Sequence, residues 1–119
     1  TMGLYATDTA PITTASAIDV ANGVLFYKLS GSTTLNHYIV ATTGTTTAAG
    51  TLANDTYVTA GFYYDGGSSM QVFFNDVRVA TVATTNLPTT ELAISFGVQN
   101  GDGNADVLSI DYVFASKER

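Results

Sequence analysis

The chain alternates apolar and polar side chains with a period of two, in short segments separated by turn residues. Segments of this kind, rich in Val, Ile, Thr, Tyr and Phe, are 23–29, 35–42, 56–64, 70–74, 77–82, 92–99 and 107–115. They predict β-strands, because no long stretch shows the i, i+3, i+4, i+7 spacing of an amphipathic helix. We expect at most one helical turn, near residues 14–20. Short strands at this spacing predict an antiparallel β-sandwich or barrel.

The connections between these segments have turn chemistry of their own. Asn75-Asp76 separates two apolar segments by only two residues, which is the spacing of a tight hairpin with a primed turn. Asp65-Gly66-Gly67 supplies residues that adopt positive φ at low cost. No internal repeat, linker or change of composition divides the 119 residues. We therefore expect a single domain over residues 1–119.

Alternation also assigns side chains to the two faces of each strand. One face of each of the last two segments is formed by Leu92, Ile94, Phe96 and Val98, and by Leu108, Ile110, Tyr112 and Phe114. Several opposite faces are small and polar, as in a half-buried sheet. The segment 24–27 is apolar on both sides, so it is either central in a sandwich or covered by a partner. Phe26 and Tyr27 are therefore candidate interface residues.

Composition narrows the function. The chain has no cysteine, which excludes disulfides and thiolate metal sites. A net charge of -6 argues against a nucleic-acid-binding surface, because phosphates are neutralised by clustered Lys and Arg. No window approaches the ~18 apolar residues of a membrane span. Charged residues make up only 12% of the chain, and threonine supplies much of the polar surface. This composition is typical of extracellular and virion surface proteins.

We expect no enzymatic activity. His37 is the only histidine, and a catalytic base needs a nucleophile and an orienting carboxylate within reach. A histidine at the surface or at a sheet edge is the simpler interpretation. Glycoside hydrolysis needs two acids that flank the scissile bond. The only glutamates are Glu91, in a connection, and Glu118, near the C-terminus.

Two groups of residues are candidates for binding. Asp102, Asn104 and Asp106 have a D-x-N-x-D spacing whose oxygens can converge on Ca²⁺, although no glutamate follows at the EF-hand distance. A plain Asp/Asn/Gly turn explains the same residues. By the period-two alternation of their segment, Tyr57 and Tyr63 lie on the face opposite the core. We expect them to stack on a sugar ring or to anchor a neighbouring subunit.

Parts of the chain resemble known proteins. Residues 55–81, with a strand that ends at Asp65-Gly66 and a hairpin turn at Asn75-Asp76, resemble the concanavalin A-like jelly roll of laminin-G and lectin type. Asp76 stands where glycine is usual in that family. Residues 86–101 and 108–113, NLPTTELAISFGVQNG and LSIDYV, resemble structural proteins of tailed phages, especially marine and cyanobacterial ones. The early GLYATD, residues 3–8, resembles a strand of the same proteins.

The resemblance implies a jelly-roll β-sandwich that is shortened at its N-terminus, since complete members have further strands there. It implies a non-enzymatic virion structural protein, a capsid decoration (cement) or fibre protein that binds the capsid shell and copies of itself. A homo-oligomer is expected, and a trimer suits local threefold positions of a capsid. The alternative is a carbohydrate-binding, lectin-like module for host surface polysaccharide. None of the lectins' sugar or metal ligands maps onto this sequence.

Overall fold

The computed structural model is built from strands alone in the residues that it describes, which are 1–6, 11–14, 17–99, 105 and 107–117. The strands are β1 (Met2–Tyr5), β2 (Ile12–Thr14), β3 (Ala17–Ile18), β4 (Asn22–Tyr27), β5 (Thr34–Ala41), β6 (Thr43–Thr51), β7 (Ala60–Tyr64), β8 (Ser69–Phe74), β9 (Val77–Ala83) and β10 (Ala93–Phe96). The expected all-β class is confirmed. The helical turn expected near residues 14–20 is wrong, because β2 and β3 pair there. No helix of these residues has the length and apolar character to cross a bilayer.

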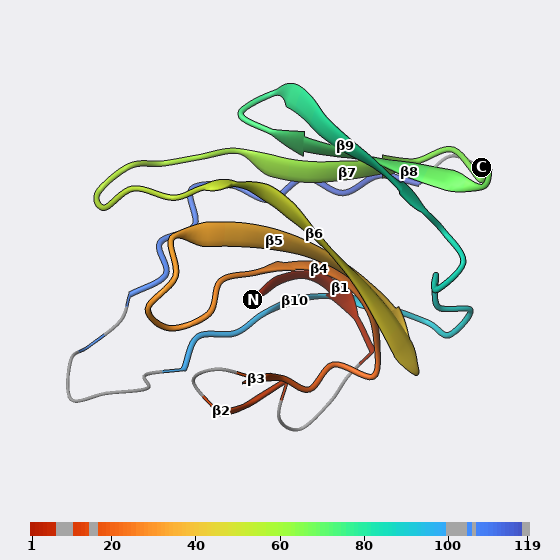
Figure 1. Cartoon of the computed structure of the whole chain (residues 1–119), viewed down its shortest axis with the longest axis horizontal. Coiled ribbons are helices and arrows are strands. Elements are labelled where there is room, and N and C mark those ends of the chain that lie inside the picture. The colour runs from red at the N-terminus through yellow and green to blue at the C-terminus, as the bar shows by residue number, and fades with distance from the viewer. Residues whose placement is uncertain (7–10, 15–16, 100–104, 106, 118–119) are drawn as a thin grey trace.

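The strands form three antiparallel sheets. The largest has the order β10-β1-β4-β5-β6, and the others are β7-β8-β9 and the short pair β2-β3. Figure 1 shows the three-stranded sheet above the five-stranded sheet and the β2–β3 pair below it, with β6 nearest to β8 and β9. This layering is consistent with a β-sandwich.

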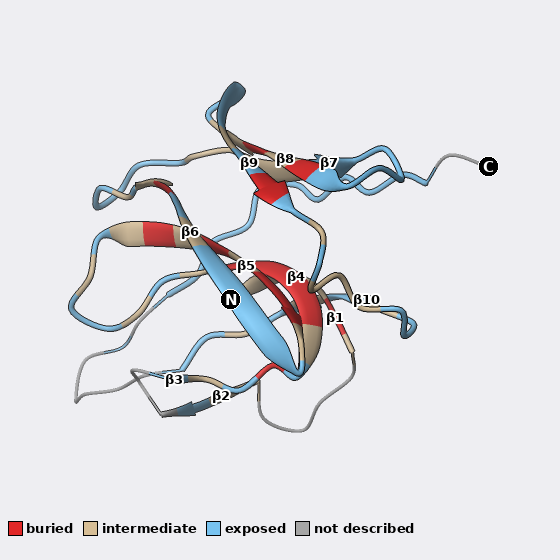
Figure 2. Ribbon diagram, turned by 45° about the vertical axis from the view of Figure 1, so that its right-hand side comes forward, coloured by how far each residue is buried: buried red, intermediate tan, exposed pale blue. Residues whose placement is uncertain are grey.

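Two hydrophobic clusters hold the layers together, and β4 contributes to both. Val24 and Phe26 pack between the two larger sheets with Ile39, Met70 and Val72. Leu25 packs on the opposite face. Figure 2 shows the buried residues concentrated on β4 and β5. The segment 24–27 is therefore central in the sandwich, and Phe26 is buried inside the chain rather than presented to a partner.

The longest strand, β6, is one that alternation did not predict. Its sequence TGTTTAAGT lacks large apolar residues, yet it pairs with β5 over its whole length. A Cβ added at Gly50 would lie 2.7 Å from the ring of Phe74, and one at Gly44 would overlap the ring of Tyr38. Neighbouring aromatic rings thus cover the backbone of β6. The position of this strand therefore depends more on the rings of Tyr38 and Phe74 that pack on it than on its own side chains.

The last predicted strand is wrong. Residues 107–115 lie in no strand, and every one of their side chains is exposed. The preceding prediction, 92–99, shortens to β10. A period-two pattern shows which side chains a segment buries once it is paired. Pairing itself requires a free sheet edge in the correct place, which no local pattern specifies.

The hairpin turn at residues 75–76 is confirmed. Asn75 and Asp76 have φ values of 49° and 63°, so both adopt the positive φ that a primed two-residue turn requires. Asparagine and aspartate tolerate this region better than most residues. Aspartate at position 76 is therefore compatible with this turn.

His37 is buried, so the expectation of a surface histidine is wrong. Its ring centroid lies 5.3 Å from that of Phe26 and 5.9 Å from that of Phe62. Neither ring nitrogen has a hydrogen-bond partner in the described part of the chain. Burial lowers the pKa of His37 to about 4, because an apolar site disfavours the imidazolium.

The close packing of β1 on β4 makes a first prediction. A Cβ at Gly3 would lie 2.5 Å from both the Cα of Leu25 and the carbonyl oxygen of Val24, which are backbone atoms that cannot rotate away. We expect Gly3→Ala to lower the free energy of unfolding by about 2 kcal/mol in urea titrations. Gly61→Ala is the control, since a Cβ there meets nothing within 4 Å. Equal effects of the two substitutions would contradict this packing.

Burial of His37 makes a second prediction. An unfolded histidine takes up a proton near pH 6.5, whereas folded His37 resists protonation down to about pH 4. The unfolded state binds more protons between these values, so the free energy of unfolding falls as the pH is lowered through this window, by about 3 kcal/mol in all. We expect His37→Leu to flatten that dependence in urea titrations at stepped pH. The unaltered chain and His37→Leu have the same carboxylates, so any difference between their pH profiles is due to His37. Parallel profiles would show that His37 does not contribute.

Candidate functional site

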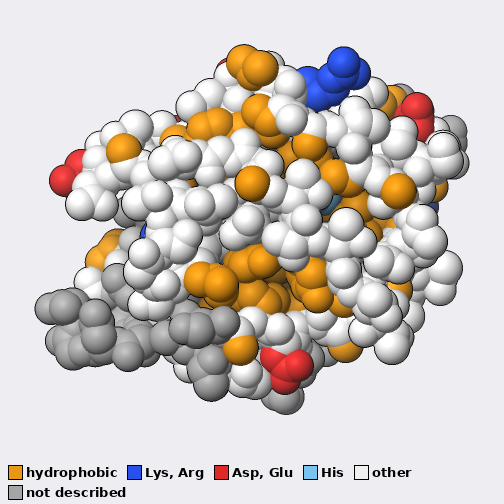
Figure 3. Space-filling view, in the orientation of Figure 1, with side chains coloured by type: hydrophobic (Ala, Val, Ile, Leu, Met, Phe, Trp, Pro, Cys, Tyr) orange, Lys and Arg blue, Asp and Glu red, His pale blue; other side chains and the backbone are white. Residues whose placement is uncertain are grey.

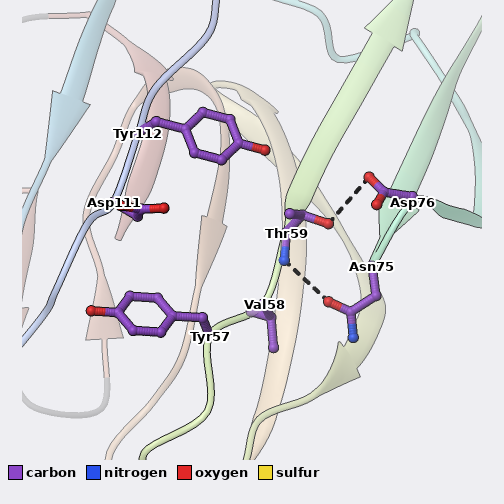
Figure 4. A pocket seen from close by; sticks show the side chains of 7 residues that line it. All are labelled: Tyr57, Val58, Thr59, Asn75, Asp76, Asp111 and Tyr112. Carbon is purple, nitrogen blue, oxygen red and sulfur yellow. Dashed lines mark hydrogen bonds between the residues drawn. The ribbon is translucent and has the colours of Figure 1, made fainter.

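A pocket of about 220 Å³ lies where three separate parts of the chain meet. The parts are the residues just before β7, the turn between β8 and β9, and the segment 107–117. The residues that line it are Tyr57, Val58, Thr59, Asn75, Asp76, Asp111 and Tyr112. Figure 4 shows the two tyrosines on one side of the pocket and the turn residues on the other.

Hydrogen bonds fix the turn side of the pocket. The Thr59 N–H donates to Asn75 Oδ1 at 3.1 Å, and the Thr59 hydroxyl donates to Asp76 Oδ1 at 3.3 Å. The Asn75 N–H donates to the Thr59 carbonyl oxygen at 2.8 Å. The positive-φ turn and the entry to β7 are thus one hydrogen-bonded unit. This wall presents an amide and a carboxylate in a fixed arrangement.

The other side of the pocket is aromatic and acidic. Tyr57 and Tyr112 are 74% and 69% exposed. The Asp111 side chain lies between their rings (Figure 4). No basic side chain is among the described residues that line the pocket. Ring faces and hydrogen-bond acceptors in one hollow suit a ligand with an apolar face and hydroxyl or N–H donors.

Only one of the four predicted binding residues lines this pocket. Tyr57 lines it, whereas Tyr63, which is 46% exposed on β7, does not. Tyr27 packs edge-to-face on Tyr38 at 5.9 Å. Asp111 and Tyr112 were not predicted as binding residues, because the pattern assigned both to a strand. A carboxylate directly before a tyrosine was the only signal in the sequence.

The pocket has two carboxylates, Asp76 and Asp111, and no histidine among its described residues. His37 lies in the hydrophobic core and lines no part of the pocket. Among the described residues, no group of three or more His, Asp or Glu side chains is placed to hold a metal ion. The calcium candidates Asp102, Asn104 and Asp106 lie outside the described residues. Calcium binding there stays a prediction.

A second candidate site is an apolar surface. Its exposed side chains belong to the end of β10 and to the segment 107–114: Ile94, Phe96, Val98, Val107, Leu108, Ile110, Tyr112, Val113 and Phe114. We call this set the β10/C-terminal apolar surface. Figure 3 shows hydrophobic side chains gathered in the middle of one face, over the region of β1, β4 and β10, whereas Figure 1 shows the segment 107–117, in blue, along the three-stranded sheet. The set therefore has two parts, one at β10 and one in the C-terminal segment. Exposed apolar side chains gathered in this way are typical of interaction sites.

Comparisons with protein-family models, with curated proteins and with solved structures found no match for this chain. Function is therefore inferred from the pocket and from the apolar surface.

Proposed function

We propose that this chain is a non-enzymatic virion structural protein with a jelly-roll sandwich, a capsid decoration or fibre protein that binds the capsid shell and copies of itself. The observation that carries the proposal is the β10/C-terminal apolar surface. Phe114 and Val107 are 82% and 83% exposed. A lone soluble chain gains nothing from holding such side chains in water, whereas burial against a partner is worth ~25 cal/mol per Å².

The charge distribution supports a surface that is meant to be covered. The cores of protein interfaces are depleted in charged residues and enriched in aromatic ones. Over residues 92–99 the chain has no charged side chain, and over 107–116 only Asp111. The low overall charge then reflects surface that the assembly covers, with threonine left to face water.

Open sheet edges support the same proposal. The outer strands are β10 and β6 in the large sheet, and β7 and β9 in the three-stranded sheet. Exposed edges invite pairing with other chains unless something covers them. Subunits of an oligomer, such as a trimer on a capsid shell, would provide that cover.

The proposal predicts binding through the apolar surface. We expect the purified chain to associate with itself in sedimentation velocity and to co-sediment with empty capsid shells of the phage that encodes it. Val107→Ser with Phe114→Ser should weaken both more than tenfold, since each removes a large exposed apolar group. Val77→Ser is the matched control, because Val77 is 63% exposed on β9, outside this surface. A chain that stays monomeric and leaves the shells bare would refute the proposal.

Carbohydrate binding is a second candidate function, favoured by the pocket. Tyr57 and Tyr112 offer ring faces on which the apolar face of a sugar stacks. Asp76, Asp111 and Asn75 offer acceptors and an amide for its hydroxyls. Such a module would recognise a host surface polysaccharide.

This second function predicts a defined loss on a glycan array. We expect Tyr57→Ala or Tyr112→Ala to reduce binding of the fluorescently labelled chain at least tenfold, because each removes one stacking ring. Tyr63→Ala should leave binding unchanged, since Tyr63 lies outside the pocket. Glycan binding is rejected if the unaltered chain gives a blank array.

A further inference from the structure

Among the described residues, no strand pairs with the outer side of β10, so this edge is free to accept another strand. The Thr1 amino group donates to the Gly97 carbonyl oxygen at 2.7 Å, and the Gly97 N–H donates to the Thr1 carbonyl oxygen at 3.0 Å. Thr1 and Gly97 are thus a hydrogen-bonded pair, and such pairs alternate along an antiparallel ladder. Ser95, paired with Gly3, is the next one. The N–H and C=O groups of Ile94 and Phe96 therefore point away from β1, toward the open edge.

The side chains of the same two residues are also uncovered. In the register of the sheet, Phe96 is opposite Met2, and Met2 is opposite Phe26, which lies in the core between the sheets. Phe96 and Ile94 therefore belong to the inner face of the large sheet. They are nevertheless 41% and 52% exposed. Phe62 of β7 packs over β4 and β5, and β9 lies by β6, so the three-stranded sheet leaves this end open.

The chain also contains a segment that has the pattern of a strand and no partner strand in the part of the chain that the structure describes. In residues 107–115, Leu108, Ile110, Tyr112 and Phe114 alternate with smaller or polar residues. Residues 107–115 lie in no strand. The exposed fractions of these four side chains run from 41% to 82%. Asp111 and Tyr112 lie beside the entry to β7, away from β10 in the pairing of the sheets. An acceptor edge and a donor segment thus occur in one chain without pairing with each other.

We propose that residues 107–115 of one copy add as a strand to the β10 edge of a second copy. The added strand bonds to the outward backbone groups of Ile94 and Phe96. It covers their side chains with the Leu108/Ile110 side of its own pattern. This is β-strand addition, in which backbone hydrogen bonds provide affinity and alternate side chains provide specificity. The inference rests on the proposed self-association and specifies how it occurs.

The exposed area suits a second copy as the occupant. The nine side chains of the β10/C-terminal apolar surface average more than half exposed. At roughly 200 Å² for each large side chain, they present on the order of 1,000 Å². A stable interface buries about 800 Å² per partner. One chain reaches this value only when its donor segment and its β10 edge are both covered, so two copies that donate to each other reciprocally meet the requirement.

The other open edges fit the donor less well. The side chains that β6 exposes are mainly threonine, with no large apolar group for the donor to cover. β9 carries the exposed cation Arg78, and an edge charge opposes strand addition. β7 lies next to the donor of its own chain at the pocket, yet forms no ladder with it. β10 combines a free edge, apolar side chains and no charge.

Cross-linking tests the pairing directly, because the chain has no cysteine of its own. One preparation carries Ala93→Cys on β10, and the other carries Ser109→Cys in the donor segment. Both positions are exposed and lie on the side opposite Ile94 and Leu108, so neither removes an apolar contact. After mixing and treatment with a flexible bis-maleimide, we expect a heterodimer on a denaturing gel.

A proline in the donor tests the backbone bonds. Ile110→Pro removes one N–H and fixes φ, which blocks a central strand position. Residue 110 lies in no strand of the monomer, so its fold is not disturbed. We expect the yield of heterodimer to fall at least tenfold. Ser116→Pro, just beyond the donor segment, is the matched control and should leave the yield unchanged.

The outcomes separate the two proposals. A chain with both cysteines that cross-links only within itself, at every dilution, overturns strand addition between copies, because the donor then returns to its own β10. Absence of the heterodimer overturns strand addition but not the proposed function when the unaltered chain still associates or binds capsid shells. If the unaltered chain does neither, both proposals fall. A heterodimer that Ile110→Pro abolishes and Ser116→Pro retains supports strand addition.

Discussion

The structure depends on apolar packing against both faces of one strand, β4. Its alternate side chains contribute to the cluster between the sheets and to the cluster on the opposite face. Phe26 contacts Phe62 of β7, and Leu25 packs on the opposite face of the sheet. Both hydrophobic clusters are therefore coupled through six residues. The same packing explains why His37, next to Phe26, is held without a polar partner. The burial of its neighbours offsets the cost of two unpaired nitrogens.

The unequal size of the two sheets leaves apolar side chains uncovered. Five strands face three, so part of the inner face of the large sheet is not covered by the described part of its own chain. The exposed side chains of Ile94 and Phe96 lie at that end. The pocket lies elsewhere, where Asp111 and Tyr112 lie near the entry to β7 without forming a ladder with it.

Local chemistry predicted much of the fold. Alternation located β4, β5, β8 and β9, and the two-residue spacing at Asn75-Asp76 identified the primed turn, because these signals reside in consecutive residues. Alternation missed β6, because its glycines lie under the rings of Tyr38 and Phe74, which come from other strands. It assigned a strand to 107–115, since no pattern reports whether an edge is free. Tyr57 was identified by its exposure, but its partners Asp111 and Tyr112 are distant in sequence and meet it only through the fold.

The threonine-rich strand β6 has a consequence for the size of any assembly. A sheet whose two edge strands both pair with other copies can add subunits without limit and grow into a fibre. Here one end of the large sheet is apolar at β10, and the other presents hydroxyl groups that water solvates readily. A copy that associates through β10 leaves no second adhesive edge on the sheet for the next copy. Growth by edge-to-edge stacking of the large sheet therefore terminates, and strand addition gives a closed particle of few subunits where the donor segments are exchanged reciprocally or around a ring.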